Sequence, residues 1–147
     1  MDILSKFSEN LKELMFERKI KNGTLAKALE VKESTISRYI NGKRLPTYGN
    51  FVKMLEYFQC SADFLIGKLE YPPTDLVFQS IPPFSERFRY LLETHKMTQY
   101  ALHQKTNFSY DNFNQWLKGT TAPFLDNLEK LANAFNCSVD YLIGHVR

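Results

Sequence analysis

Two kinds of hydrogen-bonding chemistry are concentrated in residues 32–44, KESTISRYINGKR. Arginine and short polar side chains can hydrogen-bond base edges in a DNA groove, whereas lysine, arginine and amide donors bind phosphate oxygens. The residues that could read bases are Glu33, Ser34, Ser37 and Arg38, and those that could bind phosphates are Asn22, Lys27, Lys32, Asn41, Lys43 and Arg44. Taken alone, the loop at residues 41–44 is better explained as a solvated charged loop on a helical bundle.

Two short helices are expected to position these side chains. Leu25 and Leu29 fall at helical spacing before the three-residue junction EVK, and Ile36 and Tyr39 do so after it. A junction this short holds two helices at a large angle, as in a helix-turn-helix. The second helix then turns its short polar side chains and Arg38 outward, where they can enter a major groove without steric conflict.

The same pattern occurs twice in the chain. The segment FQCSADFLIG begins at Phe58 and FNCSVDYLIG begins at Phe135, and a shift of 77 residues aligns residues 7–70 with residues 84–147 without a gap. Repeats of this length indicate two small domains instead of one larger one. We therefore predict domains over residues 1–70 and 84–147.

Each domain is predicted to contain five helices and no strands. In the first domain the expected helices span residues 5–19, 23–30, 33–41, 47–59 and 61–69. The segment between the domains, residues 71–83, reads YPPTDLVFQSIPP, and its two Pro-Pro pairs interrupt any helical period. This linker carries aromatic and aliphatic side chains, so we expect it to dock on a domain.

Charge and composition narrow the classes of function. Residues 1–70 carry 12 Lys and Arg against 9 Asp and Glu, whereas residues 84–147 carry 7 against 6. No apolar run is long enough to span a membrane, and the start MDILSKFSEN is too polar for a signal peptide, so we expect a cytoplasmic protein without membrane contact.

Nothing in the sequence favours an enzyme. The three histidines, His95, His103 and His145, have no metal-ligand spacing with cysteines or carboxylates, and no glycine-rich phosphate loop is present. We therefore expect no catalytic residue, no metal site and no cofactor.

The motifs resemble those of the XRE/Cro-type repressor helix-turn-helix family. The resemblance lies in Leu25-Ala26, in STISR at residues 34–38, in NGKR at residues 41–44 with Pro46, and in CSADFLIG. The second copy is similar through MTQYAL at residues 97–102, Gly119, Pro123 and LANAFNCSVDYLIG. One departure is Glu30, which stands where the family favours glycine at the turn, whereas Asn107 suits that turn better.

The resemblance implies an all-α fold of two tandem five-helix, repressor-like domains joined by a proline-rich linker. It also implies that the chain binds double-stranded DNA by inserting a recognition helix around residues 33–41 into the major groove. Transcriptional regulation, by repression through occupation of a promoter, is likewise an implication of the family.

The second copy lacks several features of the first. Thr120 and Thr121 replace Lys43 and Arg44, and Asp111 would repel phosphates. Its candidates for DNA contact are Gln99, Tyr110, Asn114 and Gln115. The alternative function is a protein-interaction or dimerisation module, especially for this copy, and the sequence leaves open a homodimer or an intramolecular pseudo-dimer.

Overall fold

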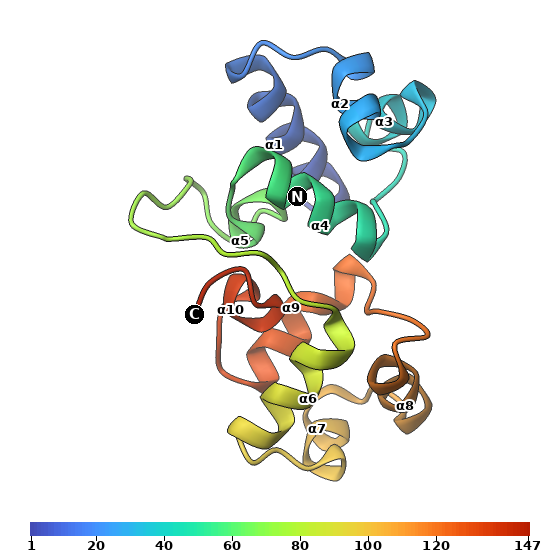
Figure 1. Ribbon diagram of the computed structural model, residues 1–147, viewed down its shortest axis with the longest axis vertical. Coiled ribbons are helices and arrows are strands. Elements are labelled where there is room, and N and C mark those ends of the chain that lie inside the picture. Colours follow the sequence, from blue (N-terminus) through green and yellow to red (C-terminus); the bar gives the residue numbers. More distant parts are fainter. The chain divides into compact units, whose positions relative to one another are not determined.

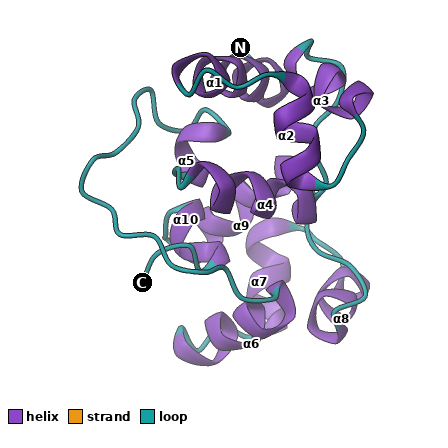
Figure 2. Cartoon of the chain, turned by 45° about the horizontal axis from the view of Figure 1, so that its top comes forward, coloured by secondary structure: helices purple, strands orange, loops and turns teal.

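The structure is a computed structural model that describes residues 1–147, and all of its regular elements are helices (Figures 1 and 2). The chain divides into two compact units, Met1–Leu76 and Val77–Arg147. The first unit contains α1 (Ile3–Glu17), α2 (Asn22–Leu29), α3 (Glu33–Ile40), α4 (Tyr48–Phe58) and α5 (Ala62–Leu65), and the second contains α6 (Phe84–Thr94), α7 (Gln99–Thr106), α8 (Tyr110–Lys118), α9 (Leu125–Ala134) and α10 (Val139–Ile143). The predicted all-α fold with five helices in each copy is confirmed. None of these helices has the length and hydropathy needed to cross a lipid bilayer.

The internal repeat is visible in the backbone angles. Ten residues have a positive φ, and they form five pairs whose members lie 77 residues apart. The pairs are Lys19 and Lys96, Glu30 and Asn107, Gly42 and Gly119, Gln59 and Asn136, and Gly67 and Gly144. Because a left-handed residue lets the chain turn away from a helix end, both units reverse direction at the same five places.

Buried aromatic rings attach α3 and α8 to their units. In the first unit Phe7 of α1 meets Tyr39 of α3 edge-on, with 6.0 Å between ring centroids. In the second unit Phe88 of α6 meets Trp116 of α8 in the same geometry at 5.5 Å. Burying such a ring stabilises a fold by about 1.5–3 kcal/mol, so each contact fixes the inner face of a helix and leaves its outer face available.

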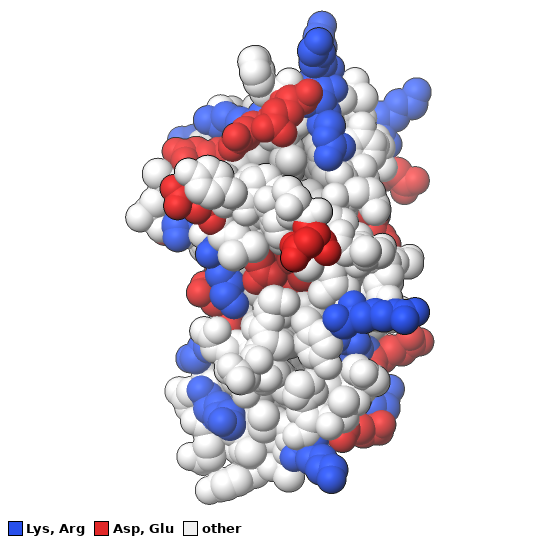
Figure 3. Space-filling model, turned by 90° about the vertical axis from the view of Figure 1, so that its left-hand side faces the viewer, with Lys and Arg blue, Asp and Glu red and all other residues white.

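Charge is distributed without a dominant patch on the face shown in Figure 3. Lysine and arginine side chains alternate there with aspartate and glutamate, and uncharged atoms occupy much of the area between them. The whole chain has a formal net charge of +3. A functional surface must therefore be identified from particular residues instead of bulk charge.

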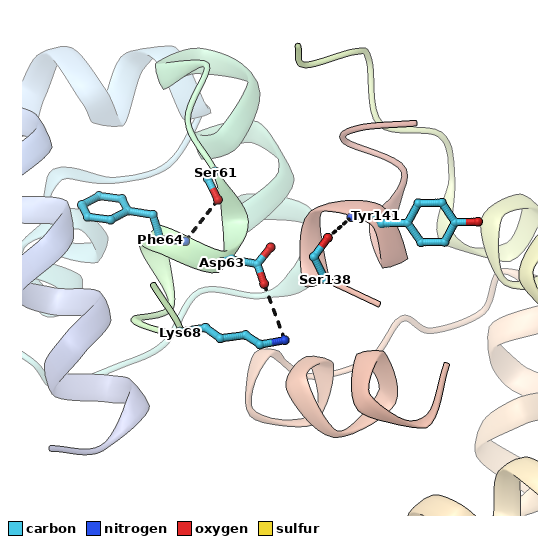
Figure 4. Close-up of polar contacts among 6 residues, drawn as sticks. All are labelled: Ser61, Asp63, Phe64, Lys68, Ser138 and Tyr141. Atoms are coloured by element: carbon cyan, nitrogen blue, oxygen red, sulfur yellow. Dashed lines mark hydrogen bonds and ion pairs between the residues drawn. The ribbon is translucent and has the colours of Figure 1, made fainter. Parts of the chain in front are cut away.

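Side-chain caps define the starts of several helices. Ser61 Oγ accepts a hydrogen bond from the Phe64 amide at 3.2 Å, and Ser138 Oγ accepts one from the Tyr141 amide at 3.0 Å, at the starts of α5 and α10 (Figure 4). Asp2 caps α1 by accepting from the Ser5 amide at 2.8 Å, and this backbone hydrogen bond lowers the pKa of its carboxyl group.

The last helix of the first unit is shorter than predicted. It ends at Leu65, whereas the expected helix continued to residue 69. The amides of Lys68 and Leu69 both turn back to the carbonyl oxygen of Asp63, at 2.8 and 3.1 Å, and Gly67 takes a φ of +87°. A left-handed glycine that closes such bonds ends a helix, and this signal in the sequence outweighs the apolar residues beyond it.

The segment predicted as the linker is divided between the two units. Residues 77–83 belong to the second unit, where Phe78 stacks on the buried ring of His145 with 4.3 Å between centroids. The Gln79 amide donates to the His145 carbonyl oxygen at 2.9 Å, and Gln79 Nε2 donates to the Gly144 carbonyl oxygen at 3.0 Å. These contacts close the second unit over the end of α10.

Candidate DNA interface

The inner and outer faces of α3 have opposite character. Ile36 and Tyr39 are fully buried, whereas Ser34 and Arg38 are exposed and Ser37 is half-buried. The helix begins after Lys32, an exposed residue whose side chain makes no capping bond. The structure thus places a serine pair and one arginine on the solvent side of a helix whose other side is fixed in the core.

The C-terminal end of α3 is anchored while its polar side chains remain accessible. Ser8 Oγ of α1 donates to the Ile40 carbonyl oxygen at 2.6 Å. Asn41 follows the helix, and its Nδ2 donates to Ser37 Oγ at 3.1 Å. Gly42 then turns the chain with a φ of +68°, so that the next two residues leave the helix axis. A loop held in this way presents its amides and side chains with little loss of conformational freedom on binding.

Five cations lie on α2, on α3, in the turn between these helices and in the loop after α3. Lys27, Lys32, Arg38, Lys43 and Arg44 are all exposed. None of them forms an ion pair, whereas Lys68 is paired with Asp63 at 3.8 Å. Asn22, the remaining residue predicted to contact phosphate, is half-buried at the first position of α2. Unpaired cations around an outward helix are the chemistry that neutralises DNA phosphates.

Glu33 lies differently from the other predicted base-reading residues. Its carboxyl group occupies the space beside Gly23, where an added Cβ atom would stand 2.2 Å from Oε1. This position is near the start of α2, whose N-cap residue, Lys21, makes no side-chain capping bond. A carboxylate near a helix N-terminus is stabilised by the helix dipole, so this position suits the charge of Glu33.

The second unit repeats the geometry with different side chains. Phe113 and Trp116 of α8 are buried, and Asn114 on the opposite face is exposed. Tyr110 begins the helix and stacks on His103 of α7 with 4.7 Å between ring centroids. The His103 Nδ1 atom donates to the Phe108 carbonyl oxygen at 2.7 Å, which fixes the orientation of its ring.

Comparison with known families agrees with this paired geometry. A family model described as a Cro/C1-type HTH DNA-binding domain matches residues 87–147, and a model described as helix-turn-helix matches residues 11–65. The chain consists of two tandem Cro/C1-type helix-turn-helix domains. These domains identify the general class of the chain as a DNA-binding transcription regulator. No curated protein and no solved structure is significantly similar to the chain.

Within the second Cro/C1-type domain, the predicted contact residues are only partly brought together. Tyr110 and Asn114 lie on the outer part of α8, and Gln115 is half-buried beside the loop that follows the helix. There the hydroxyl of Thr121 donates to Gln115 Oε1 at 3.4 Å. Gln99 is half-buried at the first position of α7, the position that Asn22 holds in the first domain.

One surface of the second domain was missed by the sequence analysis. Phe124, at the residue before α9, is 75% exposed and borders a hollow of about 220 Å³ between α8 and the loop after it. Its signal in the sequence is that a phenylalanine stands where the repeat has Thr47, a helix-capping residue in the first domain.

No group of three or more His, Cys, Asp or Glu side chains is arranged to hold a metal ion.

Proposed function

We propose that the chain is a sequence-specific DNA-binding regulator that inserts α3 of its first domain into the major groove. It then acts as a repressor by occupying promoter DNA. The observation that carries the proposal is the outer face of α3, where exposed Ser34 and Arg38 are surrounded by unpaired cations.

The roles of the side chains follow from their chemistry and exposure. Arg38 can donate two hydrogen bonds to the O6 and N7 atoms of a guanine, and Ser34 and Ser37 can bond either partner of a base pair. Lys43 and Arg44, together with the amides of the loop that Gly42 turns, suit phosphate oxygens. These contacts bind a nucleic acid and assign no catalysis to the chain.

The position of Glu33 narrows the set of base-reading residues that we propose. Because its carboxyl group lies against the start of α2, we assign sequence reading chiefly to Ser34, Ser37 and Arg38. Glu33 then contributes by fixing the position of α3 relative to α2 and by disfavouring phosphates that approach this end of the helix.

The proposal is tested by two substitutions with different expected effects. Arg38→Ala should relax the preference for one base and weaken specific binding by about 1–3 kcal/mol, because a base contact is lost. Lys43→Ala should weaken binding to all sequences alike and reduce the slope of log affinity against log salt by about one unit. Binding isotherms on a selected duplex at several salt concentrations measure both quantities.

A matched control is Lys12→Ala, which removes one exposed cation from α1. It should leave base preference unchanged and alter the salt slope less than Lys43→Ala does. Equal effects of all three substitutions on affinity and preference would show that α3 and its loop are not the DNA-binding surface.

A further inference from the structure

The hollow beside Phe124 is an uncharged surface at the place where the first domain is most cationic. It is lined by Asn112, Gln115 and Trp116 of α8, by residues 121–124 of the following loop and by Asn127 of α9. None of these residues is charged. Its volume of about 220 Å³ is below the range of roughly 300–1,000 Å³ that is typical of small-molecule sites, so it suits a single side chain.

The repeat shows what has changed at this place. In place of two cations and a helix cap of the first domain, this surface has a carboxamide, a hydroxyl and an exposed ring. Arg38, Arg44 and Thr47 of the first domain correspond to Gln115, Thr121 and Phe124 of the second. Loss of charge together with gain of an aromatic side chain is the composition that marks the centre of protein–protein interfaces, not of DNA-binding surfaces.

Phe124 is unfavourable for the isolated domain in two respects. Thr47 Oγ1 caps α4 by accepting a hydrogen bond from the Asn50 amide at 3.2 Å, whereas Phe124 makes no capping bond to α9. Its ring is also 75% exposed to water. Phe124 thus neither caps its helix nor packs in the core of its own domain. Such an unfavourable residue is expected where a surface has a function.

A second change removes a hydrogen bond from a residue that lines the hollow. In the first domain Asn50 Nδ2 donates to the Tyr39 hydroxyl at 3.2 Å. The corresponding residues are Asn127 and Trp116, and an indole has no hydroxyl to accept that bond. Asn127 lines the hollow together with Asn112 and Gln115.

We infer that this surface binds the same surface of a second copy of the chain, so that Phe124 of each copy enters the hollow of the other. A two-fold contact requires a surface that is complementary to itself. The projecting ring and the hollow supply complementary shapes, and carboxamides both donate and accept hydrogen bonds. Because the lining is uncharged, the linings of two copies can meet without repulsion between like charges. The proposal goes beyond DNA binding by the first domain and does not depend on it.

The test compares the full-length chain with Phe124→Thr by sedimentation equilibrium over a range of micromolar concentrations. The wild-type chain should approach twice the 17.2 kDa monomer mass, and Phe124→Thr should raise the Kd for dimerisation at least tenfold. The substitution restores the threonine cap of the first domain, so it should also raise the thermal unfolding midpoint of the second domain. A loss of dimer accompanied by a gain in stability cannot come from misfolding.

Two further variants complete the test. Phe16→Thr removes a ring that is 85% exposed on α1 and should leave the dimer unchanged. Thr121→Arg, which copies Arg44, should weaken the dimer because it brings two like charges together across the two-fold axis.

A wild-type chain that stays monomeric overturns the inference, as does a dimer insensitive to Phe124→Thr. If Phe124→Thr lowers DNA affinity without changing the mass, the surface faces DNA instead. Binding of α3 to DNA is measured separately through Arg38→Ala, so the two proposals can fail independently.

Discussion

Glu30 and Asn107 occupy the same turn in the two domains, and both have left-handed backbone conformations. Their φ angles are 59° and 62°. Glutamate has no short polar group that could bond its own backbone, so it adopts this conformation at a greater cost than asparagine or glycine does. The turn between α2 and α3 must nevertheless be left-handed, because it sets the angle at which α3 leaves α2.

Replacing Glu30 with glycine should therefore stabilise the first domain. We expect Glu30→Gly to raise the free energy of unfolding by about 1 kcal/mol, since it relieves the backbone strain. Denaturant unfolding monitored by circular dichroism measures the change. Ala28→Gly is the control two residues away in α2, where glycine should lower stability by about 0.5–1 kcal/mol. A Glu30→Gly chain that is no more stable than wild type would contradict the assignment of strain to this residue.

Single residues differ in how well the sequence predicts their surroundings. The exposure of Ser34 and Arg38 follows from their spacing relative to Ile36 and Tyr39 on one helix, so it could be predicted. The position of the Glu33 carboxyl group could not, because it depends on how closely α2 approaches α3. The hollow beside Phe124 was missed for a similar reason. It lies between α8 and the loop after it, and the helical period of α8 does not predict the path of that loop.

At the scale of elements, helix number and order could be read from apolar spacing, whereas ends and connections were less certain. The end of α5 at Leu65 depends on Gly67 and on two amides that share the Asp63 carbonyl oxygen, a feature of the local turn that apolar spacing does not show. The linker, residues 71–83, was expected to dock on a domain that could not be named, and its part over residues 77–83 belongs to the second unit. Its partner is the end of α10, where Phe78 stacks on His145.

Removing the Phe78 ring should destabilise the second domain selectively. We expect Phe78→Ala to lower its free energy of unfolding by about 1–2 kcal/mol, because a stacked aromatic pair is lost. Trp116, the chain's single tryptophan, is buried in this domain and reports its unfolding by fluorescence. The control is Val77→Ala, since Val77 is 86% exposed and should contribute less than about 0.5 kcal/mol. Equal effects of the two substitutions would mean that residues 77–83 do not stabilise the domain.

At the scale of the whole molecule, one duplicated fold carries two different surfaces. The first domain keeps unpaired cations around α3, and residues 1–70 have an excess of three positive charges. The second domain keeps the helices and the five left-handed turns, but it lacks a basic loop after α8. The two domains thus share the residues that determine the fold, while the exposed residues of α3 and α8 and of the loops after them differ.

The central claim is that the outer face of α3 reads a DNA sequence. The most direct measurement is selection of bound duplexes from a randomised DNA pool by the full-length chain at physiological salt, with Arg38→Ala selected in parallel. We predict an enriched sequence motif for the wild-type chain and a weaker preference at one or more of its positions for Arg38→Ala. A folded wild-type chain that enriches no motif, or whose motif is unchanged by Arg38→Ala, would contradict the account.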